Sequence, residues 1–308
     1  MGIFGNMMNN YFYGKSGKGD YRIEDMPANR FQLFTSVWKV RWSAMFGVNI
    51  LHIIPCLPAA IWTIMNISML LTMDAEMLIG GAAGYVTIYL AVLFPLIAIT
   101  GPFQAGTAFV LRNWARDEHS FVWSDFWDAV KGNWKQALPV AALSGLMPLL
   151  LHICWQFYGS LAADNFLYMI PLGLVMLVVI MWTLSVQVMY TVMVTYSLSL
   201  KNLIRNAILI TMARLPLSIG IKLLTLVVPA IIFAVLMVFP GIELYVFLVT
   251  CLLYATYVPV LNRFIVASYS NAVCEKFLNA KIEGARTNIG LRPENWDDTE
   301  YLPEDDED

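Results

Sequence analysis

The distribution of charged side chains constrains this chain more than any other feature. Six long stretches contain no Asp, Glu, Lys or Arg, and they lie at 42–73, 77–111, 136–163, 165–200, 223–242 and 244–262. A helix needs roughly 20 apolar residues to cross a hydrocarbon core about 30 Å thick, and every stretch reaches or nearly reaches that length. Hydrophobic residues make up 59% of the chain and charged residues 13%, against about 45–50% and about 25% in soluble domains. These proportions exclude a water-soluble enzyme, a disordered protein and a nucleic-acid binder, and they indicate a protein that crosses a membrane several times.

The apolar stretches favour helices over barrel strands. Residues 172–182, for example, are apolar on every side, whereas barrel strands alternate apolar and polar residues over about ten positions. We therefore predict an all-α polytopic membrane helix bundle in the cell membrane, with a cytoplasmic segment at 1–36, a six-span domain at 37–270 and a cytoplasmic tail at 271–308. The six transmembrane helices are expected near 44–71, 83–112, 136–158, 166–196, 218–239 and 243–265.

The cationic side chains predict the orientation of these spans. All 19 Lys and Arg residues lie before the first stretch, between the second and third, between the fourth and fifth, or after the sixth, where Arg263 is the first. The connectors on the other side contain only acidic charges, namely Asp74, Glu76, Asp164 and Glu243. Because Lys and Arg are enriched in cytoplasmic connectors, both termini are expected in the cytoplasm.

Two cytoplasmic connectors have the pattern of amphipathic helices that lie in the headgroup region. In 120–136, four aromatic side chains recur at helical spacing and form a candidate cytoplasmic interface: Trp123, Phe126, Trp127 and Trp134. In 201–214, apolar residues alternate with basic ones, and Pro216 ends the run. The acidic stretch at 294–308 contains no basic residue and is expected to be solvated and disordered.

Polar side chains within the spans are candidates for function, because hydrocarbon penalises them. Four of them form a candidate substrate pathway: His52, Gln104, His152 and Gln187. The alternative is that each makes a structural hydrogen bond between helices, worth about 0.6–2 kcal/mol. With three His in the whole chain, no metal site and no cofactor are expected.

Proline and glycine residues mark candidate helix breaks within the first two spans. These are Pro58, Pro95, Gly101 and Pro102, and Pro229 interrupts the fifth span. Proline removes a helix hydrogen bond and bends the axis. Such breaks either expose backbone groups that bind a polar ligand near the membrane midplane or serve packing alone.

Residues 93–138 carry a series of short motifs: Gly101-Pro102, Ala105-Gly106, Val110-Leu111-Arg112-Asn113, Ala115-Arg116-Asp117-Glu118-His119, Trp123-Ser124-Asp125-Phe126 and Asn133-Trp134-Lys135-Gln136-Ala137. This segment resembles the YesL-like family of small bacterial integral membrane proteins, which are typical of Gram-positive bacteria. Trp38-Lys39, Asn49 and Cys56-Leu57-Pro58 are also similar to the family's first span, whereas Gln104 departs from the small residue expected there. The family has no established biochemical activity, so the resemblance implies no catalytic residues. It implies an association with carbohydrate uptake, because members are often encoded near such systems.

Two functions remain as hypotheses. The first is a non-enzymatic accessory or regulatory membrane protein linked to carbohydrate uptake. Besides the lipid bilayer, it would contact a carbohydrate ABC permease or another membrane protein through its cytoplasmic aromatic helices. The alternative is a small-solute, sugar-type transporter whose pathway passes the four polar residues named above.

Overall fold

The computed structural model describes residues 25–72 and 75–293, and within these ranges the chain forms helices and no strands. The predicted all-α class is therefore confirmed for the described chain. The α-helices are α2 (Arg30–Ile53), α3 (Leu57–Thr72), α4 (Ala75–Trp114), α5 (Val122–Ala162), α6 (Met169–Thr195), α7 (Leu200–Ala213), α8 (Leu215–Thr225), α9 (Val227–Val238), α10 (Glu243–Thr256) and α11 (Val258–Phe277). Two short 3-10 helices lie between α-helices, η2 (Ile54–Cys56) and η3 (Phe166–Tyr168), and a third, η4 (Asn279–Lys281), follows α11.

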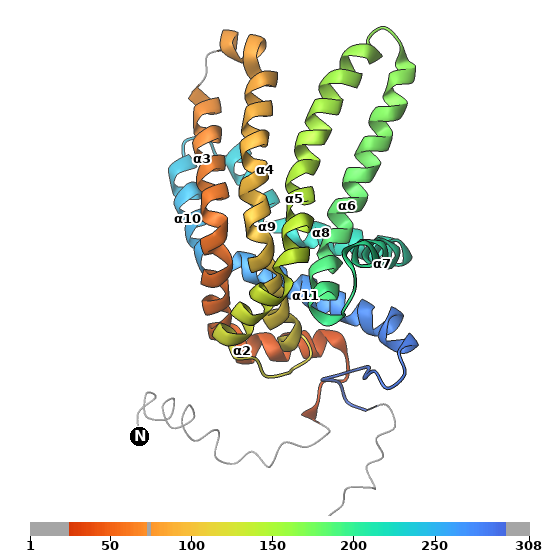
Figure 1. Cartoon of the computed structure of the whole chain (residues 1–308). Coiled ribbons are helices and arrows are strands. Elements are labelled where there is room, and N and C mark those ends of the chain that lie inside the picture. The colour runs from red at the N-terminus through yellow and green to blue at the C-terminus, as the bar shows by residue number, and fades with distance from the viewer. Residues whose placement is uncertain (1–24, 73–74, 294–308) are drawn as a thin grey trace, which may run out of the picture.

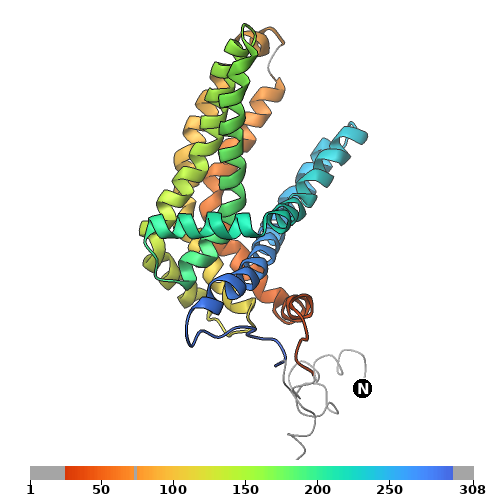
Figure 2. The ribbon, with the colours of Figure 1, turned by 90° about the vertical axis from the view of Figure 1, so that its right-hand side faces the viewer.

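The helices form a long upright group and a shorter arm. Figure 1 shows α3 beside α4 and a tall hairpin made of α5 and α6. Figure 2 shows the arm formed by α9 and α10 leaning away from the long helices. The first and last described residues lie together at the end opposite the α5–α6 connection (Figure 1), where the Arg292 N–H donates to the Pro27 carbonyl at 3.0 Å.

Four helical stretches are long and apolar enough to cross a membrane, and they cover residues 30–70, 81–114, 122–162 and 166–195. Two bent helix pairs raise the number to as many as six if each pair is one span. The first pair is α7 with α8, bent by 96°, and the second is α10 with the helix that follows it, bent by 49°. The predicted fifth span, 218–239, comprises most of α8 and all of α9, which are separated at Leu226.

The segment at 120–136 differs from the predicted separate helix. It forms the first turns of α5, which runs without interruption from Val122 to Ala162 and contains 41 residues. At 1.5 Å per residue, α5 is about 60 Å long, twice the thickness of a hydrocarbon core. The helix continues from the aromatic segment into the apolar stretch, and Pro139 lies inside it without ending it. The second predicted amphipathic helix is separate: Ser199 caps the start of α7, and Pro216 lies in the first turn of α8.

The candidate helix breaks behave in two different ways. Pro95 and Pro102 both lie inside the continuous helix α4, so the predicted interruption there is wrong. Gly101 is instead a contact point, because a Cβ atom at this position would lie 2.4 Å from the Ala137 carbonyl oxygen of α5. Pro58 lies in the first turn of α3, directly after the 3-10 turn that separates α2 from α3. The missing side chain at Gly101 thus allows the backbones of α4 and α5 to approach closely.

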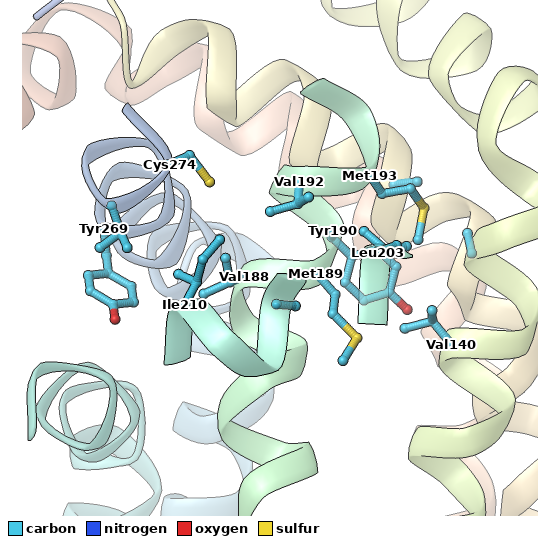
Figure 3. Packing of buried hydrophobic residues seen from close by; sticks show 14 of the residues in the cluster. Val140, Val188, Met189, Tyr190, Val192, Met193, Leu203, Ile210, Tyr269 and Cys274 are labelled. Carbon is cyan, nitrogen blue, oxygen red and sulfur yellow. The ribbon is translucent and has the colours of Figure 1, made fainter. Parts of the chain in front are cut away.

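The buried core lies in the half of the molecule nearest the described chain ends. In α5 every buried residue lies between Phe126 and Gly145, and in α6 all but Leu172 lie between Trp182 and Met193. Figure 3 shows one cluster, in which a row of side chains extends from Tyr269 of α11 at one end to Val140 of α5 at the other. A second cluster joins α2, α4, α5 and α11. The remaining halves of the long helices expose apolar side chains, as lipid-facing helices do.

Candidate functional site

His52 is a buried residue of α2 that bonds to α4. Its Nδ1 lies 3.1 Å from the Thr107 hydroxyl oxygen, and the Thr107 hydroxyl itself donates to the Phe103 carbonyl at 3.0 Å. His52 therefore joins α2 to α4 through the Thr107 hydroxyl.

Gln104 lies on α4 one turn before Thr107 and binds an arginine. The Arg263 guanidinium of α11 donates from Nη2 to Gln104 Oε1 at 2.8 Å, and Gln104 Nε2 donates to the Thr100 hydroxyl at 2.8 Å. The position of Arg263 after the sixth charge-free stretch predicts that it lies in the connector beyond the sixth span. The structure packs it against the middle helix of the bundle instead. In the described part of the chain no carboxylate forms an ion pair with Arg263.

His152 lies far from this pair. Its Nε2 is 3.1 Å from both the Ala83 carbonyl oxygen and the Thr87 hydroxyl oxygen of α4. Gln104 is 17 residues beyond Thr87 on the same helix, which corresponds to about 25 Å along its axis. His152 therefore joins α4 to α5 in the halves of these helices that lie away from Gln104. It does not meet His52 or Gln104.

Gln187 lies on α6 and faces α8. Its Nε2 makes two long hydrogen bonds, to the Leu184 carbonyl at 3.3 Å and to the Ser218 carbonyl at 3.4 Å. Its Oε1 is buried and has no hydrogen-bond partner within the described chain. Of the four pathway candidates, Gln187 is the one whose polar group is incompletely satisfied, which is costly in a buried site.

The structure thus brings together only His52 and Gln104: His52 of α2 bonds to Thr107 of α4, which lies one turn from Gln104 on the same helix. The pathway candidates are absent from the walls of the four best-formed cavities of the described chain, which measure about 500–550 Å³ each. Three of the candidates form hydrogen bonds that link two helices, and Gln104 receives one from α11. This arrangement fits structural bonds between helices better than a continuous polar pathway.

Two asparagines satisfy backbone groups that prolines leave unpaired in the broken helices, next to the cluster of His52, Gln104 and Arg263. Pro259 lacks an N–H, so the carbonyl of Ala255, four residues earlier, has no helical donor. Asn49 of α2 fills that place: its Nδ2 donates to the Ala255 carbonyl at 2.8 Å, and its Oδ1 accepts from the Val260 N–H at 3.1 Å. Pro229 leaves the Thr225 carbonyl free in the same way, and Asn262 Nδ2 donates to it at 3.3 Å.

Sequence reasoning missed Arg263 and Asn262 as members of this cluster. The available signal was the Val258-Pro259 pair inside a predicted span, followed three and four residues later by an amide and a guanidinium. Lys222 of α8 is also close enough to Arg263 for an electrostatic interaction. Two cations therefore approach one another where the broken helices meet α4.

The aromatic interface candidates divide into exposed and buried residues. Trp123 and Trp134 are 66% and 49% exposed, so they are available for contact. Phe126 is 1% exposed and packs where Gly106 leaves room for its ring, so it is a core residue and not an interface residue. Trp127 is half-buried between the rings of Phe103 and Trp123.

A family model described as a protein of unknown function, DUF624, matches residues 61–155, which extend from α3 through most of α5. This region includes the segment at 93–138 that carries the sequence resemblance. No curated protein and no solved structure has a significant match to the chain.

Proposed function

We propose that this chain is a non-enzymatic accessory or regulatory protein of the bacterial cell membrane that is associated with carbohydrate uptake. The observation that supports this role is the bonding of the polar pathway candidates. His52, Gln104 and His152 are bound to neighbouring helices, and none of the candidates lines a described cavity. Polar side chains that are bonded in this way suit a protein that binds a partner better than one that conducts a solute.

The proposed orientation places both chain ends and the amphipathic segments in the cytoplasm. The positive-inside rule supports it, since the three connectors on the other side of a six-span arrangement contain no Lys or Arg. The hydrogen bond between Arg292 and Pro27 also supports placing both ends on one side. Under this orientation the first turns of α5 and the whole of α7 lie at the cytoplasmic surface.

The proposed partner is a carbohydrate ABC permease or another membrane protein, bound through exposed side chains of this surface. Phe121, Trp123 and Trp134 expose large aromatic groups at the start of α5, and Leu209 and Met212 are more than half exposed on α7. Aromatic side chains and Met are enriched at protein interfaces. Trp in particular is enriched among the residues that contribute most binding energy.

Co-purification with the permease tests this role. Trp123→Ala with Trp134→Ala should reduce recovery of the permease, because the two indoles supply the exposed aromatic contacts. Trp155→Ala is the matched control, since Trp155 is 54% exposed on the opposite half of α5. Equal recovery with both variants, or no recovery with the unmodified chain, would contradict the proposed interface.

The alternative function, a small-solute transporter of the sugar type, is favoured by one observation. Arg263 and Gln104 meet beside two helix breaks, and transporters commonly place their binding sites at such breaks. Uptake of sugar into proteoliposomes tests it with Gln104→Ala and His152→Ala, provided that both variants fold. Uptake that is unchanged by both substitutions would exclude the proposed pathway, and absence of uptake by the unmodified chain would exclude the transporter.

A further inference from the structure

A cavity of about 500 Å³ lies at the end of the molecule where the described chain begins and ends. Its walls come from the first residue of α2, the start of α8, the second half of α11 and the segment at 280–288 that follows it. The size falls within the range of about 300–1,000 Å³ that small-molecule sites occupy. Four elements therefore converge on one partly open cavity.

Three cations and a single carboxylate line this cavity: Arg30, Arg214, Lys276 and Glu275. Glu275 is only 4% exposed, and its charge is compensated within the protein. It pairs with Arg30 and accepts hydrogen bonds from Asn271 Nδ2 at 3.0 Å and from the Asn288 N–H at 2.7 Å. The carboxylate is thus fully used in joining α11 to α2 and to the segment at 280–288.

The other two cations have no acidic partner. In the described part of the chain, neither Arg214 nor Lys276 forms an ion pair. The Arg214 guanidinium lies 5.7 Å from the centre of the Phe277 ring, which supports it on one face and leaves its N–H groups without a protein acceptor. Arg30 also has an unused donor, because its Nη1 is buried without a hydrogen-bond partner. The cavity therefore has an excess of positive charge and of unused donors.

The rest of the lining combines polar groups with an apolar wall. The Tyr269 hydroxyl, hydrogen-bonded to the Ser218 hydroxyl at 2.6 Å, and the side chain of Thr287 add further polar groups. Leu217 and Val273 supply apolar surface beside them. Arg and Lys together provide the donors with which proteins bind phosphate, Arg through its planar fork and Lys as a point charge.

We propose that this cavity binds a phosphate group, carried either by a small phosphorylated molecule or by the headgroup of an anionic lipid. Arg214 and Lys276 neutralise the phosphate charge, and Arg30 remains paired with Glu275 while Nη1 donates to a phosphate oxygen. The apolar wall contacts the organic part of the ligand. This site does not depend on the accessory role proposed above, because it would be present in a transporter as well.

Binding is measured with the full chain in detergent, titrated with inorganic phosphate at constant ionic strength against chloride. Calorimetry should show saturable binding, and the midpoint of thermal unfolding should rise with phosphate concentration. The variant Arg214→Gln with Lys276→Gln should weaken binding at least about tenfold, since it removes two charge-assisted contacts. The variant Lys201→Gln with Arg205→Gln is the matched control, because it loses the same charge from exposed positions of α7 and should bind as the unmodified chain does.

A second set of measurements distinguishes the two sources of phosphate. The chain is placed in nanodiscs of phosphatidylcholine, with and without phosphatidic acid. The site binds a lipid headgroup if phosphatidic acid stabilises the unmodified chain but not the Arg214 and Lys276 variant, and if inorganic phosphate has no effect. A response to inorganic phosphate assigns it to a soluble ligand. The proposal is overturned if neither probe binds, or if the cavity variant and the α7 variant respond equally.

Discussion

Replacing Asn49 should destabilise the protein more than any other single amide substitution in the bundle core. Asn49 is 0% exposed and makes three hydrogen bonds, to the carbonyls of Tyr254 and Ala255 and from the N–H of Val260. Asn49→Ala leaves the Ala255 carbonyl and the Val260 N–H buried without a partner. Each orphaned group costs about 1–3 kcal/mol in a protein interior, whereas a hydrogen bond between membrane helices averages about 0.6 kcal/mol. Combining the two scales, we expect a loss of about 2–4 kcal/mol in the free energy of unfolding.

The assay is reversible unfolding of the purified chain in mixed micelles of increasing SDS content. Asn133→Ala is the matched control, because Asn133 Nδ2 bonds only to the Ala129 carbonyl of its own helix, at 2.9 Å. That control should lose less than about 1 kcal/mol. If Asn49→Ala and Asn133→Ala were equally stable, the broken helix would not depend on an amide from α2, and the reasoning would be refuted.

Two further predictions concern packing and charge. Gly101→Ala should lower the free energy of unfolding by about 1–3 kcal/mol, because its Cβ would lie 2.4 Å from the Ala137 carbonyl oxygen. Gly132→Ala is the control, since the Cβ position there is open, and it should be neutral or slightly stabilising. Equal melting temperatures for the two variants would refute the close contact. Glu275→Gln should cost about 2 kcal/mol in the same unfolding assay, less than the 3–5 kcal/mol of a fully buried pair, because Arg30 is 29% exposed. An unchanged stability for Glu275→Gln would show that the ion pair does not anchor α2 to α11.

The helical class and the positions of the apolar stretches could be predicted from the sequence, because both depend on local composition. The absence of charge over 77–111 predicts α4, and the amphipathic pattern at 201–214 with Pro216 predicts α7. These signals act over one or two helical turns. The acidic stretch at 294–308 and most of the segment at 1–36 lie outside the described residues.

The helix boundaries at prolines could not be predicted, because they depend on tertiary contacts. Pro95 and Pro102 leave α4 continuous, whereas Pro259 coincides with a bend. At Pro259 a distant amide, Asn49, satisfies the freed backbone groups and so stabilises the broken form. Sequence alone gives no sign that residues 49 and 255 will meet.

The candidate site could be predicted only in part for the same reason. The sequence predicts His52 and Gln104 as polar residues within spans, and the structure brings His52 of α2 against Thr107, one turn from Gln104 on α4. Their partners Thr107 and Arg263 were not identified. A hydroxyl is common in membrane helices, and Arg263 lies at the end of a stretch where a cytoplasmic connector was the simpler interpretation.

The orientation of the spans is the central claim, and labelling of single cysteines in intact cells tests it most directly. The variants are made in a chain whose native cysteines have been replaced, and all three positions are exposed. His119→Cys marks the connection between α4 and α5, and Ser197→Cys marks the connection before α7. Ala163→Cys marks the connection between α5 and α6. A membrane-impermeant thiol reagent should label the variant at 163 in intact cells, and the variants at 119 and 197 only after the membrane is permeabilised. Labelling at 119 or 197 from the outside would contradict the account.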